Sequence, residues 1–321
     1  MSIFYVFQGK TYEQEKDGEY IWTPKLTKDG KQNPDYEIMT EIQPGDFILH
    51  DKNGEVVAIS LARTKRNFED QSDEYKKNLD YCEFEIPFKT TNYQDFFARS
   101  FNEDSAFDKK GEGKKQYLCH LSDIHADFII TQIARTETDI DAKNLLNLAL
   151  ASITFPLDEN EYDKSEIEGI LRLLENRPEK DKPEWKFKRK PTDFLVKDGY
   201  LYRKLDLQAA ADALAKAEYK CEVDSSHNTT ISNISKKNYT EAYHLVPLNR
   251  WYNFGPSLDV MENIVSLCPL CHNVLLYGKG EKFGILKNLW DKRKNILKKC
   301  GIELSEEEFF AYYGAAYTVT V

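Results

Sequence analysis

The strongest constraint on the fold is a set of four cysteine and histidine residues in the last third of the 321-residue chain. Cys268 and Cys271 form CPLC, a knuckle that can place two thiolates on one tetrahedral metal ion. Upstream, Cys221 and His227 in CEVDSSH add a thiolate and an imidazole within a short turn. The four would close a Cys3His site of the kind that holds structural Zn²⁺. The competing interpretation is that Cys221 is a core thiol and His227 a surface residue.

Cysteine usage and hydropathy predict where the protein works. Of the six cysteines, only the CPLC pair has a short, ligand-like spacing. A chain without an export signal keeps its thiols reduced, which favours metal binding over disulfides. No window approaches the roughly 18 apolar residues of a membrane span, and the N-terminus lacks a charged start followed by an apolar stretch. We expect a soluble, cytoplasmic protein without a membrane partner.

Between and beyond the two half-sites the sequence follows a longer pattern. YTEAYHLVPL carries His244 and is followed by SLDVMENIVSLCPLCHNVLLYG. This stretch resembles the HNH endonucleases, which commonly read EAHHLIPL, then SLD, then NIVSLCPNCH, and then a closing His before Tyr-Gly. The resemblance covers residues 219–278, and its order and spacing make it far more specific than a lone CxxC. It implies a zinc-stabilised ββα-metal domain that cleaves DNA.

The resemblance also implies roles for three residues. Hydrolysis of a phosphodiester needs an activated water, a cation near the developing charge and a positioned leaving group. By position, His244 would be the general base, since an imidazole titrates near neutral pH. Asn263 would orient the loop that carries His244 through side-chain hydrogen bonds to the backbone. His272 would bind the catalytic ion, Mg²⁺ or another divalent cation. A single histidine is more often a satisfied core residue, but three positions in register favour the catalytic interpretation.

Two positions depart from the family pattern. The family usually supplies a metal-binding residue just before the base and another four residues after the His272 position, where this chain has Tyr243 and Leu276. Leucine cannot ligate, and a neutral phenol is a poor ligand for a hard cation. Glu241 would lie on the same strand face as Tyr243, so its carboxylate could replace the missing ligand. Two hypotheses stay open: an active one-metal nuclease with a remodelled site, and a catalytically impaired, zinc-stabilised DNA-binding protein that senses modified bases.

The first part of the chain is rich in strand signals. Residues 3–7 (IFYVF) predict a strand, PGDFILH and GEVVAISLA predict a hairpin around Asn53 and Gly54, and residues 81–88 alternate like a further strand. FYVFQGKTYEQEKDGEYIWTPK, followed by IQPGDFILHDKNGEVVAISLA, resembles the EVE branch of the PUA-like fold over residues 3–65. The resemblance implies a small curved β-barrel. Several family members accept a flipped base, and beside an HNH domain such a module typically senses modified cytosine.

An extruded base needs π-faces to stack on and polar groups that read its edge. Trp22 and Tyr36 are the leading aromatic candidates, with Tyr5 and Phe7 as further ones, and His50 is expected near the pocket mouth. Core packing is the competing interpretation for each aromatic residue, least so for Trp22. A barrel that reads RNA is another alternative, but the HNH partner favours DNA.

Composition changes in the middle of the chain. Residues 141–151 (DAKNLLNLALA) and 207–217 (LQAAADALAKA) favour helices, and the stretch 157–190 between them is rich in Glu, Asp, Lys and Pro. We therefore predict an α+β protein in three parts: an EVE/PUA-like modified-base-sensing domain over residues 1–150, a helical and charged connector over 151–205, and an HNH nuclease domain with structural zinc over 206–321.

The net charge of -10 argues against a protein that coats nucleic acid through bulk electrostatics. A DNA site must therefore be a local basic patch, and the candidates are residues 182–190 (KPEWKFKRK) and a helix over 282–299, the latter through Lys292, Arg293 and Lys294. The competing interpretation of each patch is a solvated face or linker. The sequence as a whole predicts restriction of double-stranded DNA that carries modified cytosine, with a homodimer as one way to cut both strands.

Overall fold

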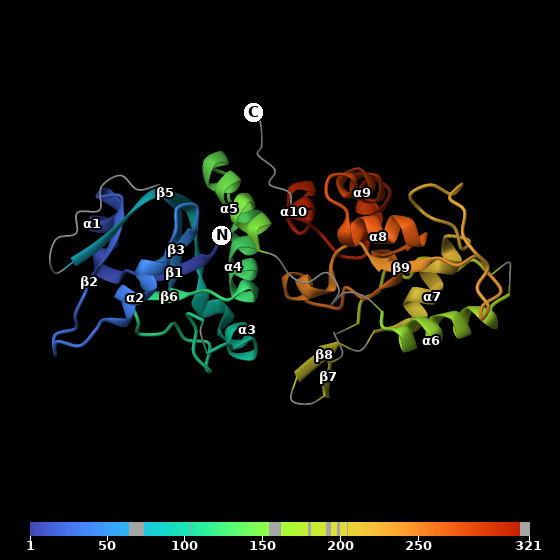
Figure 1. Ribbon diagram of the computed structural model, residues 1–321, viewed down its shortest axis with the longest axis horizontal. Helices are drawn as coiled ribbons and strands as arrows, with labels where there is room; N and C mark the ends of the chain where they lie inside the picture. Colours follow the sequence, from blue (N-terminus) through green and yellow to red (C-terminus); the bar gives the residue numbers. More distant parts are fainter. Residues whose placement is uncertain are drawn as a thin grey trace. The chain divides into compact units, whose positions relative to one another are not determined.

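The computed structural model describes residues 1–63, 74–103, 105–153, 162–178, 181–190, 194–197, 200–203 and 205–314. These residues form two compact units (Figure 1): the described residues up to 153 together with 311–314, and residues 162–310. Parts of the predicted connector, at 154–161, 179–180, 191–193, 198–199 and 204, lie outside the described residues, as do residues 64–65 of the EVE resemblance and 315–321 of the predicted nuclease domain.

The first unit alternates strands with short helices. Its elements are β1 (Ile3–Phe7), η1 (Gly9–Thr11), α1 (Tyr12–Asp17), β2 (Tyr20–Pro24), α2 (Pro34–Glu41), β3 (Phe47–Asp51), β4 (Glu55–Ala62), β5 (Glu74–Lys89), η2 (Thr90–Tyr93), α3 (Gln94–Arg99), β6 (Leu118–His120), α4 (Asp123–Thr136) and α5 (Ile140–Ser152). The strands predicted at residues 3–7 and 81–88 and the helix predicted at 141–151 are confirmed by β1, β5 and α5.

The strands of this unit form a curled, mixed sheet of six strands in the order β2-β5-β4-β3-β1-β6. β1 and β3 are parallel, and the other neighbours are antiparallel. The predicted hairpin is present: Asn53 and Gly54, with φ of 59° and 88°, turn the chain between β3 and β4, as a tight two-residue turn requires. The EVE-like barrel itself stays a prediction.

Helices cover both faces of this sheet. Phe4, Val6 and Ile48 pack with Met39 of α2 on one face. On the other face Tyr5 contacts Phe107, and the Phe107 ring stacks on Phe97. The Phe97 ring in turn contacts Phe128 of α4 edge to face. This alternation follows from the strand period of two, and it fills both faces with apolar side chains.

The second unit is built around a small sheet and three longer helices. Its elements are α6 (Lys164–Glu175), β7 (Phe194–Lys197), β8 (Tyr200–Arg203), α7 (Leu207–Lys216), β9 (Glu241–His244), η4 (Leu248–Asn253), η5 (Met261–Asn263), β10 (Ile264–Leu267), α8 (Pro269–Tyr277), α9 (Glu281–Lys299) and α10 (Glu306–Ala311), of which the last residue belongs to the first unit. The helix predicted at 207–217 is confirmed by α7, and that at 282–299 by α9.

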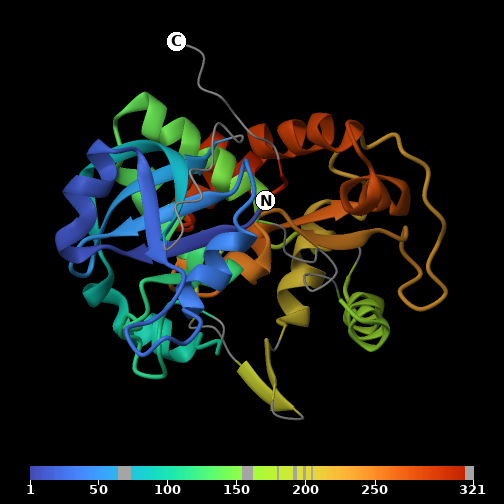
Figure 2. The same cartoon turned by 60° about the vertical axis from the view of Figure 1, so that its left-hand side comes forward.

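The core of the second unit lies between α6, α7 and the strand β10. Ile170 and Leu174 of α6 pack with the alanine-rich face of α7 and with Ile264 of β10, and Figure 2 shows α6 beside α7. β9 and β10 pair antiparallel, and α8 follows β10 directly, so the chain forms a ββα unit.

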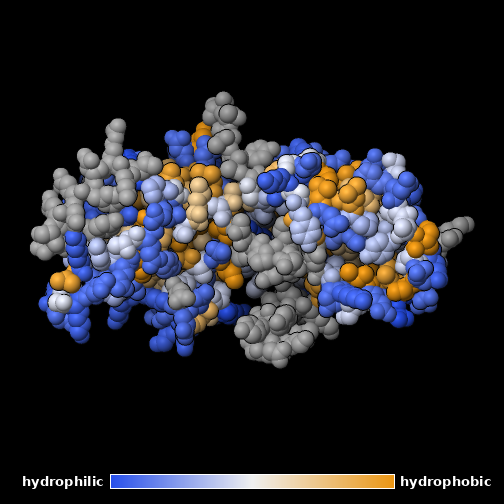
Figure 3. All heavy atoms as spheres, viewed as in Figure 1, coloured by the Kyte–Doolittle hydropathy of each residue, from blue (hydrophilic) through white to orange (hydrophobic). Residues whose placement is uncertain are grey.

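On the face shown in Figure 3, hydrophilic residues predominate, with separate hydrophobic patches among them. Among the helices within the described ranges, none combines the length and the apolar character that crossing a membrane requires.

Candidate functional site

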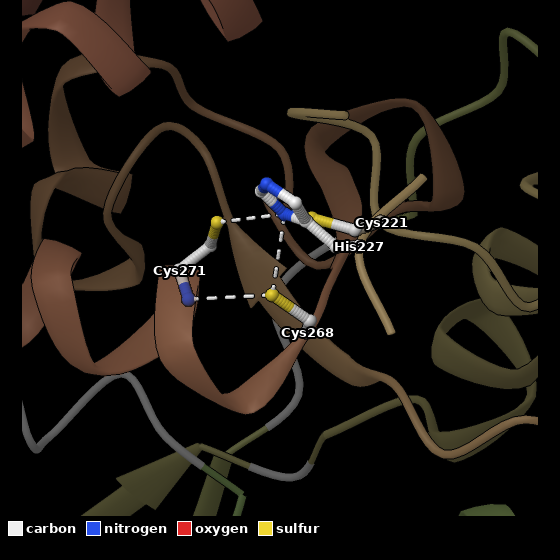
Figure 4. Close-up of side chains that lie close together, drawn as sticks. All are labelled: Cys221, His227, Cys268 and Cys271. Carbon is white, nitrogen blue, oxygen red and sulfur yellow. Dashed lines mark hydrogen bonds between the residues drawn. The ribbon is translucent and has the colours of Figure 1, made fainter. Parts of the chain in front are cut away.

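The four predicted zinc ligands come together at the base of the ββα unit (Figure 4). The ligand atoms of Cys221, His227, Cys268 and Cys271 all lie within 4.8 Å of one another. His227 Nδ1 is 3.5 Å from Cys268 Sγ and 3.4 Å from Cys271 Sγ. Cys268 precedes the first turn of α8 and Cys271 lies within that turn, which brings both thiols to one point. Three sulfurs and one imidazole nitrogen are the donor set of a closed tetrahedral zinc site.

The electrostatics of the cluster favour a bound cation. Burial disfavours the Cys221 thiolate, but the surrounding backbone N–H groups and His227 outweigh it and lower the pKa of this thiol to about 7. Burial and the two neighbouring cysteines raise the pKa of Cys271. One thiolate thus forms readily while the next resists ionisation, because like charges crowd together. A divalent cation removes this conflict.

A partly buried ion pair holds the upstream half-site against the ββα unit. The Glu222 N–H donates to Ser266 O at 2.8 Å, and Ser266 N–H donates to Glu222 Oε1 at 2.9 Å. Arg293 Nη2 of α9 donates to both oxygens of the same carboxylate, at 2.7 and 2.8 Å. The segment that begins at Cys221 is therefore fixed to β10 and to α9, independently of the metal ligands.

The predicted general base is buried and paired with a carboxylate. His244 ends β9, and its Nε2 lies 2.9 Å from Asp259 Oδ1. The Tyr162 hydroxyl is 3.5 Å from the same nitrogen, and the two rings stack with centroids 5.5 Å apart. His244 is 1% exposed, and its Nδ1 makes no hydrogen bond to any residue that the structure describes.

Asn263 holds the loop that follows β9. Its Oδ1 accepts from Val246 N at 2.7 Å, and its Nδ2 donates to Val246 O at 2.8 Å and to Leu258 O at 3.0 Å. The backbone of Asn263 also accepts from Leu245 N at 2.8 Å. Because Asn263 is fully buried, these bonds are shielded from water and fix the chain just after His244.

The predicted metal ligands His272 and Glu241 are in direct contact. His272 Nδ1 lies 2.6 Å from Glu241 Oε2, and the rings of Tyr243 and His272 meet edge to face at 5.5 Å. Both ligands line a cavity of about 200 Å³, together with Leu276. The other lining residues are Tyr162, Ile167, Ile170, Leu171, Leu214, Tyr239, Thr240, Ala242, Asn273 and Tyr277.

The Glu241 carboxylate stays ionised in this cavity. Burial alone would raise its pKa, but the hydrogen bond and charge of His272 and the hydroxyl of Tyr239 outweigh burial and lower the pKa. The cavity therefore presents a carboxylate next to an imidazole, which are two common ligands of divalent cations.

Tyr162 lies between the His244–Asp259 pair and the Glu241–His272 pair. Tyr243 and His244 are successive strand residues, so their side chains leave opposite faces of β9. Glu241 and His272 lie with Tyr243, whereas His244 lies with Asp259. Tyr162 both contacts His244 and lines the cavity of Glu241 and His272. Sequence reasoning missed Asp259 and Tyr162: the first stands in the SLD motif, and the second lies in the charged stretch, where nothing in the sequence marks it.

The base-pocket candidates of the first unit lie in different environments. His50 is fully buried: its Nδ1 is 2.8 Å from Gln8 Oε1 and its Nε2 is 2.7 Å from Ser60 Oγ. Trp22 of β2 and Tyr36 of α2 are half-buried. Another cavity in this unit, of about 420 Å³, is lined by Phe7, Gln8, Gly9, Asp51, Asn53, Gly54, Thr90, Thr91, Gln94, Gly111, Glu112 and Gly113, so Trp22, Tyr36 and His50 stand apart from it.

The two basic patches differ in what their cations contact. The expectation that Arg293 contacts phosphate is wrong, because its guanidinium is 3% exposed and engaged by Glu222. Lys292 Nζ donates to Glu222 O at the surface, and Lys294 pairs with Asp291 at 2.7 Å. Within the first patch, Lys186, Lys188, Arg189 and Lys190 line a cavity, together with Asp259.

No family model matches the chain. The chain is 22% identical over 274 residues, covering 84% of its own length and 88% of the relative, to the Type IV methyl-directed restriction enzyme EcoKMcrA of Escherichia coli (strain K12). Among solved structures it matches the Type IV phosphorothioation-dependent restriction endonuclease ScoMcrA with 17% identity and a TM-score of 0.25. That match covers 92% of this chain and spans 56% of the other.

Proposed function

We propose that the protein is a modification-dependent DNA endonuclease that hydrolyses phosphodiester bonds with an HNH-type, one-metal site. The observation that carries the proposal is the Glu241–His272 pair and the His244–Asp259 pair, which lie on opposite sides of β9 and both contact or adjoin Tyr162, next to the cysteine cluster that begins α8. Its similarity to a methyl-directed restriction enzyme over 84% of the chain supports restriction of modified DNA as the role.

His244 is suited to accept a proton at Nδ1. A neutral imidazole carries one N–H, and Asp259 accepts the hydrogen of Nε2 across 2.9 Å. The lone pair is then on Nδ1, which is the atom that must meet the attacking water. Asp259 also stabilises the imidazolium formed when Nδ1 takes the proton, as carboxylates do in other histidine-dependent sites. Asn263 keeps this geometry by fixing the backbone after β9.

Glu241 and His272 would hold the divalent ion. The proposal is supported by the distance of 2.6 Å between Glu241 Oε2 and His272 Nδ1, which line one cavity with Leu276, whereas neither Leu276 nor Tyr243 can serve as a good ligand. When bound, a Mg²⁺ or similar ion would offset the charge that develops on the scissile phosphate. The cysteine cluster would hold Zn²⁺ separately, as a structural ion.

Cleavage of a supercoiled plasmid that carries methylcytosine tests the nuclease directly. We expect nicking with at least one of Mg²⁺, Mn²⁺, Co²⁺ and Ni²⁺, its loss in His244→Ala, and a higher metal requirement in Glu241→Gln. Glu303→Gln, on an exposed loop, is the matched control for Glu241. Nicking by His244→Ala at the normal rate would overturn the assignment of the base.

A second function is favoured by the departures at Tyr243 and Leu276. If two protein ligands are too few to retain the ion, the unit would be a zinc-stabilised DNA-binding domain without cleavage. Leu276→His separates the two functions, because it would place a ligand in the same cavity. Nicking that appears only in Leu276→His would favour the binding protein, whereas nicking by the unaltered chain favours the nuclease.

We further propose that the first unit reads a modified cytosine, with Trp22 and Tyr36 as stacking residues near a flipped base. Asn33 Nδ2 donates to Thr23 Oγ1 at 2.9 Å and to Pro24 O, which ties the start of α2 to β2 and so to the strand of Trp22. His50 would support the sheet behind them, since both its nitrogens are engaged. Titration of the full chain with duplexes that contain cytosine, methylcytosine, hydroxymethylcytosine or glucosylated hydroxymethylcytosine tests this, with Trp22→Ala as the variant. Equal affinities for all duplexes would exclude the modified-base role.

A further inference from the structure

A second cavity of the second unit is lined by Asp259, the partner of the candidate base, and has a basic rim. It has a volume of about 980 Å³ and is distinct from the cavity of Glu241 and His272. Its lining includes the basic residues Lys186, Lys188, Arg189 and Lys190 and, opposite in charge, Asp206, Asp259 and Glu262. The basic segment 186–190 therefore faces the loop that carries Asp259.

This basic segment is fixed in place, although it forms no helix or strand. The backbone N–H groups of Lys186 and Phe187 both donate to Glu262 Oε1 at 2.7 Å, and Glu262 is 1% exposed. These bonds hold Phe187 at a φ of 48°, a conformation that costs a non-glycine residue free energy. A solvated linker would relax out of this conformation, so the alternative of a mere linker does not fit residues 186–190.

Arg189 anchors the same segment at its other end. Its guanidinium donates to the carbonyl oxygens of Phe254, Pro256, Ser257 and Gly301 at distances between 2.5 and 3.1 Å. Ser257 N in turn donates to Lys190 O at 2.8 Å. Arg189 is thus a brace, and the cations that remain for a ligand are the lysines.

The lysines are exposed, whereas the acids of the cavity are buried except for Asp206, whose side chain is 41% exposed. Lys188 is exposed and makes no ion pair or hydrogen bond with the described part of the chain. The Lys190 side chain is 84% exposed and lies 3.7 Å from the nearest carboxylate, that of Asp206. Asp259 and Glu262, in contrast, are only 8% and 1% exposed. A ligand approaching the rim meets positive charge, in a protein whose net charge is -10.

We infer that Lys188 and Lys190 bind consecutive phosphates of a DNA strand and direct it towards His244. The inference rests on the proposed function, since Asp259 connects this cavity to the candidate base through one hydrogen bond. A row of exposed ammonium groups suits the regularly spaced phosphates of a backbone, and it makes no demand on base sequence. Lys186 adds to the local charge, although Asp212 engages its ammonium group at 2.7 Å.

The test measures how DNA affinity depends on salt. Full-length, zinc-loaded protein is titrated against a labelled duplex with methylcytosine, without added divalent ions so that cleavage does not intervene. Lys188→Gln/Lys190→Gln removes two expected phosphate contacts, so the slope of log K against log salt should become shallower by about 1.8. Lys220→Gln/Lys236→Gln removes the same charge from exposed residues of this unit that do not line the cavity, and it should leave the slope unchanged.

Each outcome bears on the inference separately from the nuclease activity. An unchanged slope in the cavity variant, or an equal change in the control variant, would overturn it. Equal affinity for an RNA duplex, lost in the same variant, would overturn the assignment to DNA. A protein that never nicks plasmid but shows the expected change of slope keeps the DNA-backbone site and loses the proposed nuclease function. Normal nicking with an unchanged slope keeps the proposed nuclease function and overturns the DNA-backbone site.

Discussion

His244 Nε2 and Asp259 Oδ1 lie 2.9 Å apart, and both side chains are almost completely buried. The pair joins the end of β9 to the loop before η5 and fixes which imidazole nitrogen carries the hydrogen. A carboxylate in this position orients a histidine and raises its basicity. The finding makes Asp259 a positioning residue for the proposed base.

Replacement of Asp259 by asparagine tests this role. Asp259→Asn keeps the size of the side chain but removes the charge that holds Nε2–H, so plasmid nicking should slow by about 10-fold to 100-fold. Zinc content should stay the same, because it does not depend on the tautomer of His244. Asp291→Asn, an exposed residue of α9, is the control. A variant that nicks as fast as the unaltered protein, with normal zinc content, would remove Asp259 from the mechanism.

Zinc removal should unfold the second unit. Elemental analysis should find zinc bound to the purified chain, and Cys271→Ser or a strong chelator should remove it. Structural zinc contributes on the order of 10 kcal/mol to the folding of small domains, so its loss should abolish the thermal transition of this unit. Cys119→Ser is the matched control, since Cys119 is a buried thiol of β6 in the first unit. Purified protein that contains no zinc yet melts cooperatively in both units would contradict the assignment.

Two buried histidines should make the first unit sensitive to mild acid. Burial lowers the pKa of His50 to about 3 and that of His125 to about 4. Both stay neutral in the folded state, whereas the unfolded chain binds protons below about pH 6.5. Their contribution to stability is therefore complete above about pH 6.5 and is lost as the pH falls towards the folded pKa values, by up to about 1.4 kcal/mol per pH unit for each histidine.

The variant His50→Gln isolates this effect. Burial raises the pKa of Glu15 and Asp51, which has the opposite sign, because protonation of these carboxyls stabilises the folded state at low pH. The useful quantity is thus the difference in unfolding free energy between His50→Gln and the unaltered protein. As the pH falls from 7.5 to 5, the unaltered protein should lose more unfolding free energy than His50→Gln, so its advantage in stability over the variant should decrease. A difference that does not change with pH would show that His50 is protonated to the same extent in both states.

The Arg293–Glu222 pair should stabilise the second unit without binding DNA. Arg293→Met leaves the partly buried Glu222 carboxylate without its cation, and we expect a loss of up to about 3 to 5 kcal/mol in unfolding free energy, measured by urea titration. Paired replacement, Arg293→Met with Glu222→Gln, should recover part of this loss, because the uncompensated charge is gone. If Arg293 contacted phosphate instead, the salt dependence of DNA binding would change while stability stayed the same.

Local patterns predicted the elements and the zinc cluster well. The strand at residues 3–7, the hairpin at Asn53 and Gly54, and the helices α5, α7 and α9 follow from periodicity and turn residues, which act over a few positions. The CPLC knuckle and the CEVDSSH turn each bring two ligands together locally. Only the contact between these two half-sites, which are far apart in the sequence, had to be inferred. The nearness of Glu241 to His272 was likewise a hypothesis that strand alternation made reasonable.

What the sequence determined by itself is the chemistry at hand: three thiols and an imidazole for one metal, a histidine at the end of a strand, and a basic stretch in an acidic chain. Only the tertiary structure decided which of these groups meet. Asp259 and Tyr162 reach His244 across 15 and 82 positions of the chain, and Arg293 turns inward to Glu222 although its neighbours in sequence are exposed lysines. Such contacts depend on how helices and loops pack, and no local spacing encodes them.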